Sequence, residues 1–324
     1  MANATPIADL SYRNYEGPLE APEFRWWVIA KMSIRRAIKN RWYWLVMMPA
    51  AGYYLAMVLI LFVVEQMASN SVPPNAGMKE FLARIVWKDQ FLHGFSYGQM
   101  WYLVVALMLG AGTIANDNRA NALLVYLSKP CTKLDYLIGK WVGIFLPLLA
   151  VMLLPALFFY GFGLMSYRDS GFFTSDKLLL PKILLLMPVG AAFEASLIVA
   201  VSSLFKQGQI AGATFAALYF ITNFFTHLVA AAWSVNQFDE GPRNVGGSAS
   251  FGQLIYASVD GIQIGWAKAV LGTAGSQPFG IIGGPQQHFV PAPNAWAVLL
   301  IMVVMSLLAM LIAWRRIHAV EVVG

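Results

Sequence analysis

The stretch KWVGIFLPLLAVMLLPALFFYGFGLM, residues 140–165, contains no charged side chain after its first lysine. A membrane-spanning helix needs about 20 consecutive, mostly apolar residues, so this run is long enough to cross a bilayer. It lacks the alternation of apolar and polar residues that is typical of barrel strands, and a helix satisfies its backbone polar groups internally. The stretch therefore predicts an all-α membrane protein.

The composition of the whole chain supports this prediction. Of the 324 residues, 59% are hydrophobic and 12% are charged, whereas soluble globular domains carry about 25% charged residues. Five further runs have the length and composition of a membrane span. The six predicted spans are Trp44–Val64, Tyr97–Ala115, Lys140–Met165, Pro181–Phe205, Gln209–Trp233 and Ala295–Trp314. We expect them to form a single six-helix transmembrane domain over residues 44–324.

The positions of Lys and Arg set the predicted orientation, because these residues are enriched in cytoplasmic loops. A cytoplasmic N-terminus places most of the 22 Lys and Arg residues on the inner side. We therefore expect both termini in the cytoplasm, and the net charge of +6 gives no indication of a nucleic-acid partner. Residues 1–43 then form a cytoplasmic N-terminal segment, residues 116–139 a cytoplasmic connection, and residues 234–294 a large extracytoplasmic loop.

A basic amphipathic helix is predicted immediately before the first span, in the stretch EFRWWVIAKMSIRRAIKNRWYW, residues 23–44. Trp27, Ala30, Ile34 and Ile38 recur there at helical spacing, while Lys and Arg occupy much of the remaining surface. Helices of this kind lie in the headgroup layer, with their cations near anionic lipid. We expect an interfacial helix, and the alternative is a helix exposed to the cytoplasm.

Two outer segments are also predicted to contain helices. The stretch MKEFLARIVWKDQFL, residues 78–92, predicts an amphipathic helix between the first two spans. Residues 253–272 are apolar enough to enter the membrane, but Asp260, Gly261 and Gly265 interrupt them. We expect a short re-entrant or interfacial helix pair there, before the last span.

The connection between the second and third spans reads DNRANALLVYLSKPCTKLDYLIGK, residues 117–140. Residues at i, i+3, i+4 and i+7 share one face of a helix, and here they are Ala120, Leu123, Leu124 and Leu127. Pro130 is expected to end this helix, and Thr132 or Asp135 to cap the next one. The segment predicts a cytoplasmic helix from Arg119 to Lys129 that is joined directly to spans on both sides.

These residues resemble the coupling region of the type-2 ATP-binding-cassette (ABC-2) permeases. The similarity rests on an acid at position 117, Leu-Ser-Lys-Pro at 127–130, Thr-Lys at 132–133, and Asp-Tyr-Leu-Ile-Gly-Lys at 135–140. The overall plan of a basic helix, six spans and re-entrant material before the last span is also similar. The resemblance implies that the segment docks on a separate ATPase. The residues it assigns to ATPase coupling are Asp117, Arg119, Leu123, Leu127, Lys129, Pro130, Asp135 and Lys140.

The resemblance further implies the permease subunit of an ATP-driven exporter in a prokaryotic inner membrane. The working transporter would contain two copies of an ABC ATPase and a second permease copy or a paralogue, surrounded by membrane lipid. A phosphate-binding loop needs Gly-x-x-x-x-Gly-Lys followed by Ser or Thr, whereas Gly139-Lys140 is followed by Trp141. We therefore expect ATP and Mg²⁺ on the partner ATPase, and neither enzymatic activity nor a cofactor in this chain.

Two ionisable residues stand out inside the predicted spans, Glu194 near the middle of the fourth and His227 in the fifth. A charged group at the centre of a spanning helix costs about 2.5–3.5 kcal/mol on insertion scales, so such residues are candidates for a translocation path. A purely structural role is the alternative for both. The four histidines are scattered and Cys131 is the single cysteine, so we expect no metal site and no internal disulfide.

Two other classes of function are compatible with the sequence. In an ion-coupled secondary transporter or channel, Glu194 would couple transport to a proton or sodium gradient. A non-transporting membrane scaffold would use its outer loops to hold a partner protein. No motif in the chain indicates the substrate.

Overall fold

The computed structural model describes residues 24–70, 85–122, 132–168, 172–240, 253–272 and 292–317. Every regular element in these ranges is a helix, which confirms the all-α prediction. The elements are α1 (Arg25–Lys39), α2 (Arg41–Ala50), α3 (Gly52–Asn70), α5 (Trp87–Gly110), α6 (Ala115–Arg119), α8 (Lys133–Ser166), α9 (Phe172–Ser175), α10 (Leu179–Leu204), α11 (Gly208–Glu240), the 3₁₀ turn η2 (Gln253–Tyr256), α13 (Val259–Leu271) and α14 (Ala295–Arg316).

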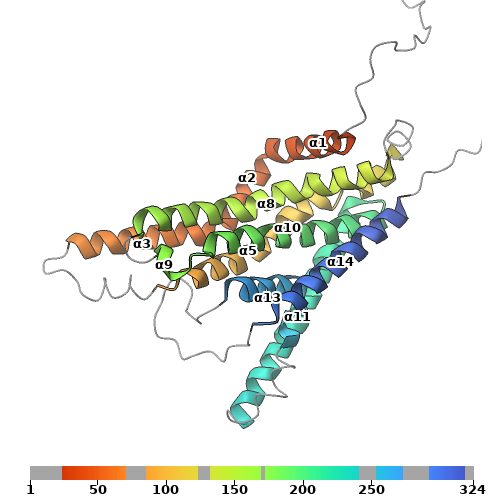
Figure 1. The fold of residues 1–324 in the computed structure, drawn as a ribbon. Helices are drawn as coiled ribbons and strands as arrows, with labels where there is room; N and C mark the ends of the chain where they lie inside the picture. The colour runs from red at the N-terminus through yellow and green to blue at the C-terminus, as the bar shows by residue number, and fades with distance from the viewer. Residues whose placement is uncertain are drawn as a thin grey trace, which may run out of the picture.

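Each predicted span has a counterpart among these helices (Figure 1). Five helical stretches in the described ranges are long and apolar enough to cross a membrane: Trp87–Arg119, Lys133–Ser166, Leu179–Leu204, Gly208–Val229 and Ala295–Arg316. The first predicted span is a bent pair, because α2 and α3 meet at an angle of 51°. Pro49 stands in the last turn of α2, where a proline weakens the helix. If this pair crosses the membrane as one unit, the number of spans is six.

Two predicted boundaries are wrong. The outer helix predicted over residues 78–92 is not a separate element where it is described, because α5 begins at Trp87 and continues into the second span. Asp89 and Gln90 in its first turn are buried, so the charge there does not mark an outside surface. α11 continues to Glu240, so the loop predicted from residue 234 begins on a helix. In the sequence, the first helix-breaking residues after this span are Gly241 and Pro242.

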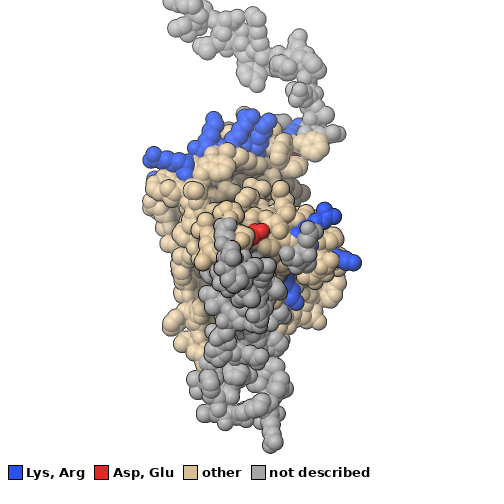
Figure 2. Space-filling view, turned by 90° about the vertical axis from the view of Figure 1, so that its left-hand side faces the viewer, with Lys and Arg blue, Asp and Glu red and all other residues tan. Residues whose placement is uncertain are grey.

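The helix α1 is present, as predicted, and buries one side against the rest of the protein. Ile29, Ala30 and Ala37 are buried, whereas Trp27 and Ile38 are 41% and 49% exposed. The exposed cations of α1 are Lys31, Arg35, Arg36 and Lys39. Figure 2 shows Lys and Arg gathered along the top of the molecule, where α1 lies. The position of α1 in a lipid headgroup layer stays a prediction.

The helix next to α1 is α8, and the two pack closely over the first turns of α8 (Figure 1). Glycines make this approach possible. A Cβ atom added to Gly139 would lie 2.6 Å from the backbone oxygen of Trp26, and one added to Gly143 would lie 2.5 Å from Cβ of Ser33. Small residues spaced by four allow close backbone approach in membranes. In this protein the helix that packs against these two glycines is α1.

The short helix pair predicted before the last span is confirmed as η2 and α13. At 13 residues α13 is about 20 Å long, too short to cross a bilayer. It packs against α5, α10, α11 and α14. The Ser258 hydroxyl accepts a hydrogen bond from the Gly261 amide at its start, and Gly272 ends it with φ 69°. The ammonium of Lys268 donates to the Tyr256 hydroxyl at 3.3 Å. Burial raises the pKa of Tyr256 to about 12 and lowers the pKa of Lys268.

The two described chain ends lie at the same end of the bundle, together with α6 and the first turn of α8 (Figure 1). We call this the α6 end. Termini on one side are what the predicted topology of six spans requires. The assignment of the α6 end to the cytoplasm rests on the distribution of Lys and Arg.

Candidate functional site

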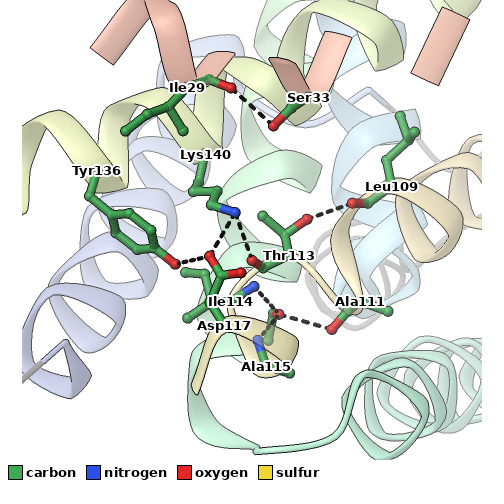
Figure 3. A network of polar contacts seen from close by, with 11 residues as sticks. Ile29, Ser33, Leu109, Ala111, Thr113, Ile114, Ala115, Asp117, Tyr136 and Lys140 are labelled. Carbon is green, nitrogen blue, oxygen red and sulfur yellow. Dashed lines mark hydrogen bonds and ion pairs between the residues drawn. The ribbon is translucent and has the colours of Figure 1, made fainter. Parts of the chain in front are cut away.

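The helix α6 follows a turn at the α6 end of α5, and a serine of α10 holds this turn (Figure 3). The hydroxyl of Ser202 accepts hydrogen bonds from the amides of Ile114 and Ala115, each at 3.1 Å. It donates to the carbonyl of Ala111 at 2.9 Å. Ser202 is fully buried. One side chain therefore satisfies amides at the start of α6 that have no partner within the helix.

An ion pair joins α6 to α8 (Figure 3). Oδ2 of Asp117 lies 2.8 Å from Nζ of Lys140 and accepts a hydrogen bond from the Tyr136 hydroxyl at 2.7 Å. Nζ of Lys140 also donates to the carbonyl of Thr113 at 3.1 Å. The side chains of Lys140 and Asp117 are only 11% and 20% exposed. Because water screens this pair weakly, removing either charge leaves the other poorly compensated.

Two asparagines connect α6 to the ends of α10 and α11. The Asn118 amide donates to the carbonyls of Ser203 and Phe205 at 3.4 Å. The backbone amide of Gly208 donates to Oδ1 of Asn116 at 3.3 Å. Together with the ion pair to α8, these bonds link α6 to three spanning helices. A displacement of α6 would act on all three.

Two pockets lie between α5 and α11, and we call the surface that holds them the α5–α11 groove. The pocket nearer α6, called the α6-end pocket, has a volume of about 780 Å³. Its lining residues are Leu107, Met108, Ala111, Gly112, Asn116, Arg119, Gln207, Gly208, Gln209, Gly212, Ala213 and Ala216. Glycine again allows close contact, because a Cβ atom on Gly208 would lie 2.8 Å from Cα of Gly112.

The second pocket, called the α13 pocket, lies between α5, α11 and the start of α13 and has a volume of about 550 Å³. Its lining residues are Ser96, Tyr97, Gln99, Met100, Tyr219, Phe220, Asn223, Phe224, His227 and Asp260. One of the two predicted path residues, His227, thus lies in a pocket with other polar side chains. Both pockets use the same pair of spanning helices, so they occupy successive levels of one groove.

The other predicted path residue, Glu194, is buried on α10 and does not line either pocket. The Gln263 amide of α13 lies close enough to interact with its carboxylate. No hydrogen bond of good geometry joins them, and in the described part of the chain the side-chain oxygens of Glu194 and the amides of Gln99 and Gln263 have no such bond. Gln99 lines the α13 pocket. We call the neighbouring residues Glu194 and Gln263 the buried polar cluster.

A comparison with protein families decides where the chain belongs. The family model described as "ABC-2 family transporter protein" matches residues 27–316, from α1 to the end of α14. The chain belongs to the ABC-2 transporter family. No curated protein matches it in a sequence search. As an ABC-2 protein it is an integral, multi-pass component of a membrane transporter, and such permeases in general associate with an ABC ATPase subunit.

The residues predicted to couple to an ATPase do not all lie together in the structure. Asp117 and Lys140 are brought together in the ion pair, and Arg119 lies exposed in the α6-end pocket. Asp135 forms a capping box at the start of α8, as predicted, since its Oδ2 accepts from the amide and hydroxyl of Thr132 at 3.1 and 2.7 Å. The predicted coupling residues that lie outside the described ranges are Leu123, Leu127, Lys129 and Pro130.

The predicted start of the cytoplasmic helix at Arg119 is wrong. α6 ends at this residue, and the chain turns at Ala120 and Asn121. The φ angle of Asn121 is 50°, a left-handed conformation that asparagine tolerates better than most residues. Ala120 is therefore not part of a helix that continues through Asn121. The structure of residues 123–131 lies outside the described ranges.

Three residues that take part in the bonds of α6 or of the turn before it were not among the predicted coupling residues. Tyr136 precedes Lys140 by four residues and so lies on the same helix face, which was an available signal. Thr113 takes part through its carbonyl, which every residue has. Ser202 is separated by 88 residues from one of the amides that it binds, so no local pattern could connect them.

Replacing Ser202 by alanine is expected to destabilise the ABC-2 protein by about 1–3 kcal/mol, because buried amides lose their acceptor. Thermal unfolding of the purified protein in detergent measures this change. Ser203→Ala is the matched control, because among the described residues the Ser203 hydroxyl donates to the Ala200 carbonyl of its own helix and to no other helix. An equal loss in both variants would contradict the role of Ser202 in holding the turn before α6.

Proposed function

We propose that this chain is the membrane-spanning subunit of an ATP-driven exporter that is powered by a separate ATPase. The observation that supports this proposal is the position of α6. It lies directly before the segment expected to dock on the ATPase, and it is bonded to α8, α10 and α11. Motion of a docked ATPase would therefore pass through α6 to three spans. This chain would not need to bind or hydrolyse ATP itself. ATP and Mg²⁺ belong to the ATPase in this proposal.

The proposed translocation path follows the α5–α11 groove. Polar side chains at membrane depth are costly against lipid and are tolerated when they face protein or water. The groove carries Gln99, Asn223 and His227 in one pocket and Asn116 and Arg119 in the other. A second permease copy or a paralogue that faces the groove would enclose these groups. The complete exporter would then have two permease subunits and two ATPase copies.

The surface of α11 supports a partner that contacts this helix. The large apolar side chains that α11 exposes are Ile210, Leu218, Phe220, Ile221, Phe224, Phe225 and Leu228, and Phe220 and Phe224 among them line the α13 pocket. The spanning parts of α11 and α14 are only 22% and 17% buried, against 67% for α10. We place the assembly in a prokaryotic inner membrane, with the α6 end and both termini in the cytoplasm.

Replacing Leu123 and Leu127 together by aspartate is expected to weaken ATPase binding by about 100-fold or more, since each buried leucine contributes about 1.5–3 kcal/mol. Co-purification with the partner ABC ATPase measures the binding, and ATP-dependent export measured with inverted vesicles tests the function. Leu134→Asp is the control, because Leu134 is exposed in the first turn of α8, where the helix dipole favours an acid. Unchanged co-purification and export in the double variant would exclude this docking face.

A further inference from the structure

We infer that the α13 pocket binds an organic cation that carries aromatic or apolar groups, and that such cations are the class of substrate the protein carries. The inference about substrate class rests on the proposed function, whereas binding to the pocket can be tested without transport. Three features of the pocket support it: its size, its charge and its rings.

The size of the α13 pocket suits a small organic molecule. Its volume of about 550 Å³ lies inside the range of about 300–1,000 Å³ that is typical of small-molecule sites. Two walls are the spanning helices α5 and α11, and the third is the start of the short helix α13. A ligand there would be held at membrane depth, beside the groove that we propose as the path.

The charge of the α13 pocket favours a cation. Asp260 supplies a carboxylate, and no Lys or Arg is present in the lining that the described residues form. Oδ1 of Asp260 accepts from the Ser258 hydroxyl and the Gly261 amide, each at 2.7 Å. Oδ2 has no hydrogen-bond partner among the described residues and is available to a ligand. Behind the lining, the carboxyl of Glu194 lies close enough to interact with Asp260 and with Tyr219.

The rings in the lining favour an organic cation over a metal ion. Tyr97, Tyr219, Phe220 and Phe224 all line the pocket, and three of these rings are 49%, 50% and 67% exposed, namely Tyr97, Phe220 and Phe224. A cation over an aromatic face gains about 0.5–2 kcal/mol, most where water is excluded. Aromatic rings also bind the apolar groups that surround the charge of an organic cation. A hydrated metal ion has no such groups.

The α6-end pocket differs in just these respects. Its lining contains Arg119 and, within the described residues, no carboxylate and no aromatic ring. The preference for an organic cation is therefore a property of the α13 pocket and not of the whole groove. The described lining of the α6-end pocket offers no carboxylate or aromatic ring that would attract a cation.

Two probes of equal shape and opposite charge test the inference on the purified full-length protein in detergent. Tetraphenylphosphonium is expected to bind saturably, and tetraphenylborate at least tenfold more weakly, by equilibrium dialysis. Asp260→Asn is expected to weaken binding of the cation about tenfold, while it keeps the oxygen that accepts the Gly261 amide. Phe224→Ala is expected to weaken it about 2- to 30-fold, the range that a single cation–ring contact spans.

The control variant is Asp176→Asn, whose carboxylate pairs with Lys182 outside the pocket and whose loss is expected to leave binding of the cation unchanged. Equal binding of the two probes to the unaltered protein, or equal affinity in Asp260→Asn, would overturn the inference. Binding of tetraphenylphosphonium without ATP-dependent export of any compound would leave the pocket inference standing and overturn the proposed function. Export of other compounds without binding of this probe would do the reverse.

Discussion

Replacing Gly139 by leucine is expected to displace α1 from α8 and to destabilise the protein by about 3 kcal/mol or more, the upper end for overpacked sites. Even a Cβ atom at this position would lie 2.6 Å from the Trp26 backbone oxygen and 2.8 Å from Cβ of Ile29. Neither atom is the flexible end of a side chain, so the contact is relieved only by moving the helix. Thermal unfolding in detergent measures the stability.

The same displacement is expected to expose the backbone of α1 to protease. Trypsin cleaves after the exposed cations of α1, such as Lys31 and Arg35, once that helix is no longer held against α8. Gly161→Leu is the matched control, because it makes the same substitution on the same helix, where no atom lies within 4 Å of the added Cβ. If both variants unfold at the same temperature and resist trypsin equally, α1 is not held at Gly139.

The sequence allowed the spanning helices to be predicted because their signal is local. The uncharged run after Lys140 is long enough to determine a helix by itself, and Thr132 and Asp135 lie at the spacing of a capping box. Gly139 and Gly143 lie four residues apart, a spacing that allows close backbone approach. Their partner could not be predicted, because the fit between these glycines and Ser33 depends on how two distant segments meet.

The sequence identified some residues of the candidate sites, but it did not show which residues lie next to one another. Glu194 and His227 were singled out because ionisable groups in spans are costly, yet one lies in the buried polar cluster and the other in the α13 pocket. Gln99 and Gln263 are uncharged and gave no such signal. Asp260 was read as a helix interruption, whereas in the fold it is the carboxylate of a pocket. These groupings come from helix packing, which no single segment encodes.

The ion pair between Asp117 and Lys140 is expected to couple the ATPase to the spans, and a double-mutant cycle can separate this role from stability. Asp117→Asn and Lys140→Met are each expected to cost about 1–3 kcal/mol in unfolding free energy. This is below the 3–5 kcal/mol of a fully buried pair, because both groups retain some exposure. The double variant is expected to cost little more than either single one, since no unpaired charge remains.

Export responds differently from stability in this cycle. Because the pair is a direct link between α6 and α8, the double variant is expected to lose most ATP-driven export while it still binds the ATPase. The control is the pair Asp176–Lys182, which is also partly exposed but joins the residues before α10 to the first turn of α10, at the opposite end from α6. Asp176→Asn with Lys182→Met should leave export intact. If both double variants export equally well, the Asp117–Lys140 pair only stabilises the fold, and the bonds of Asn116 and Asn118 to α11 and α10 become the remaining route for the motion.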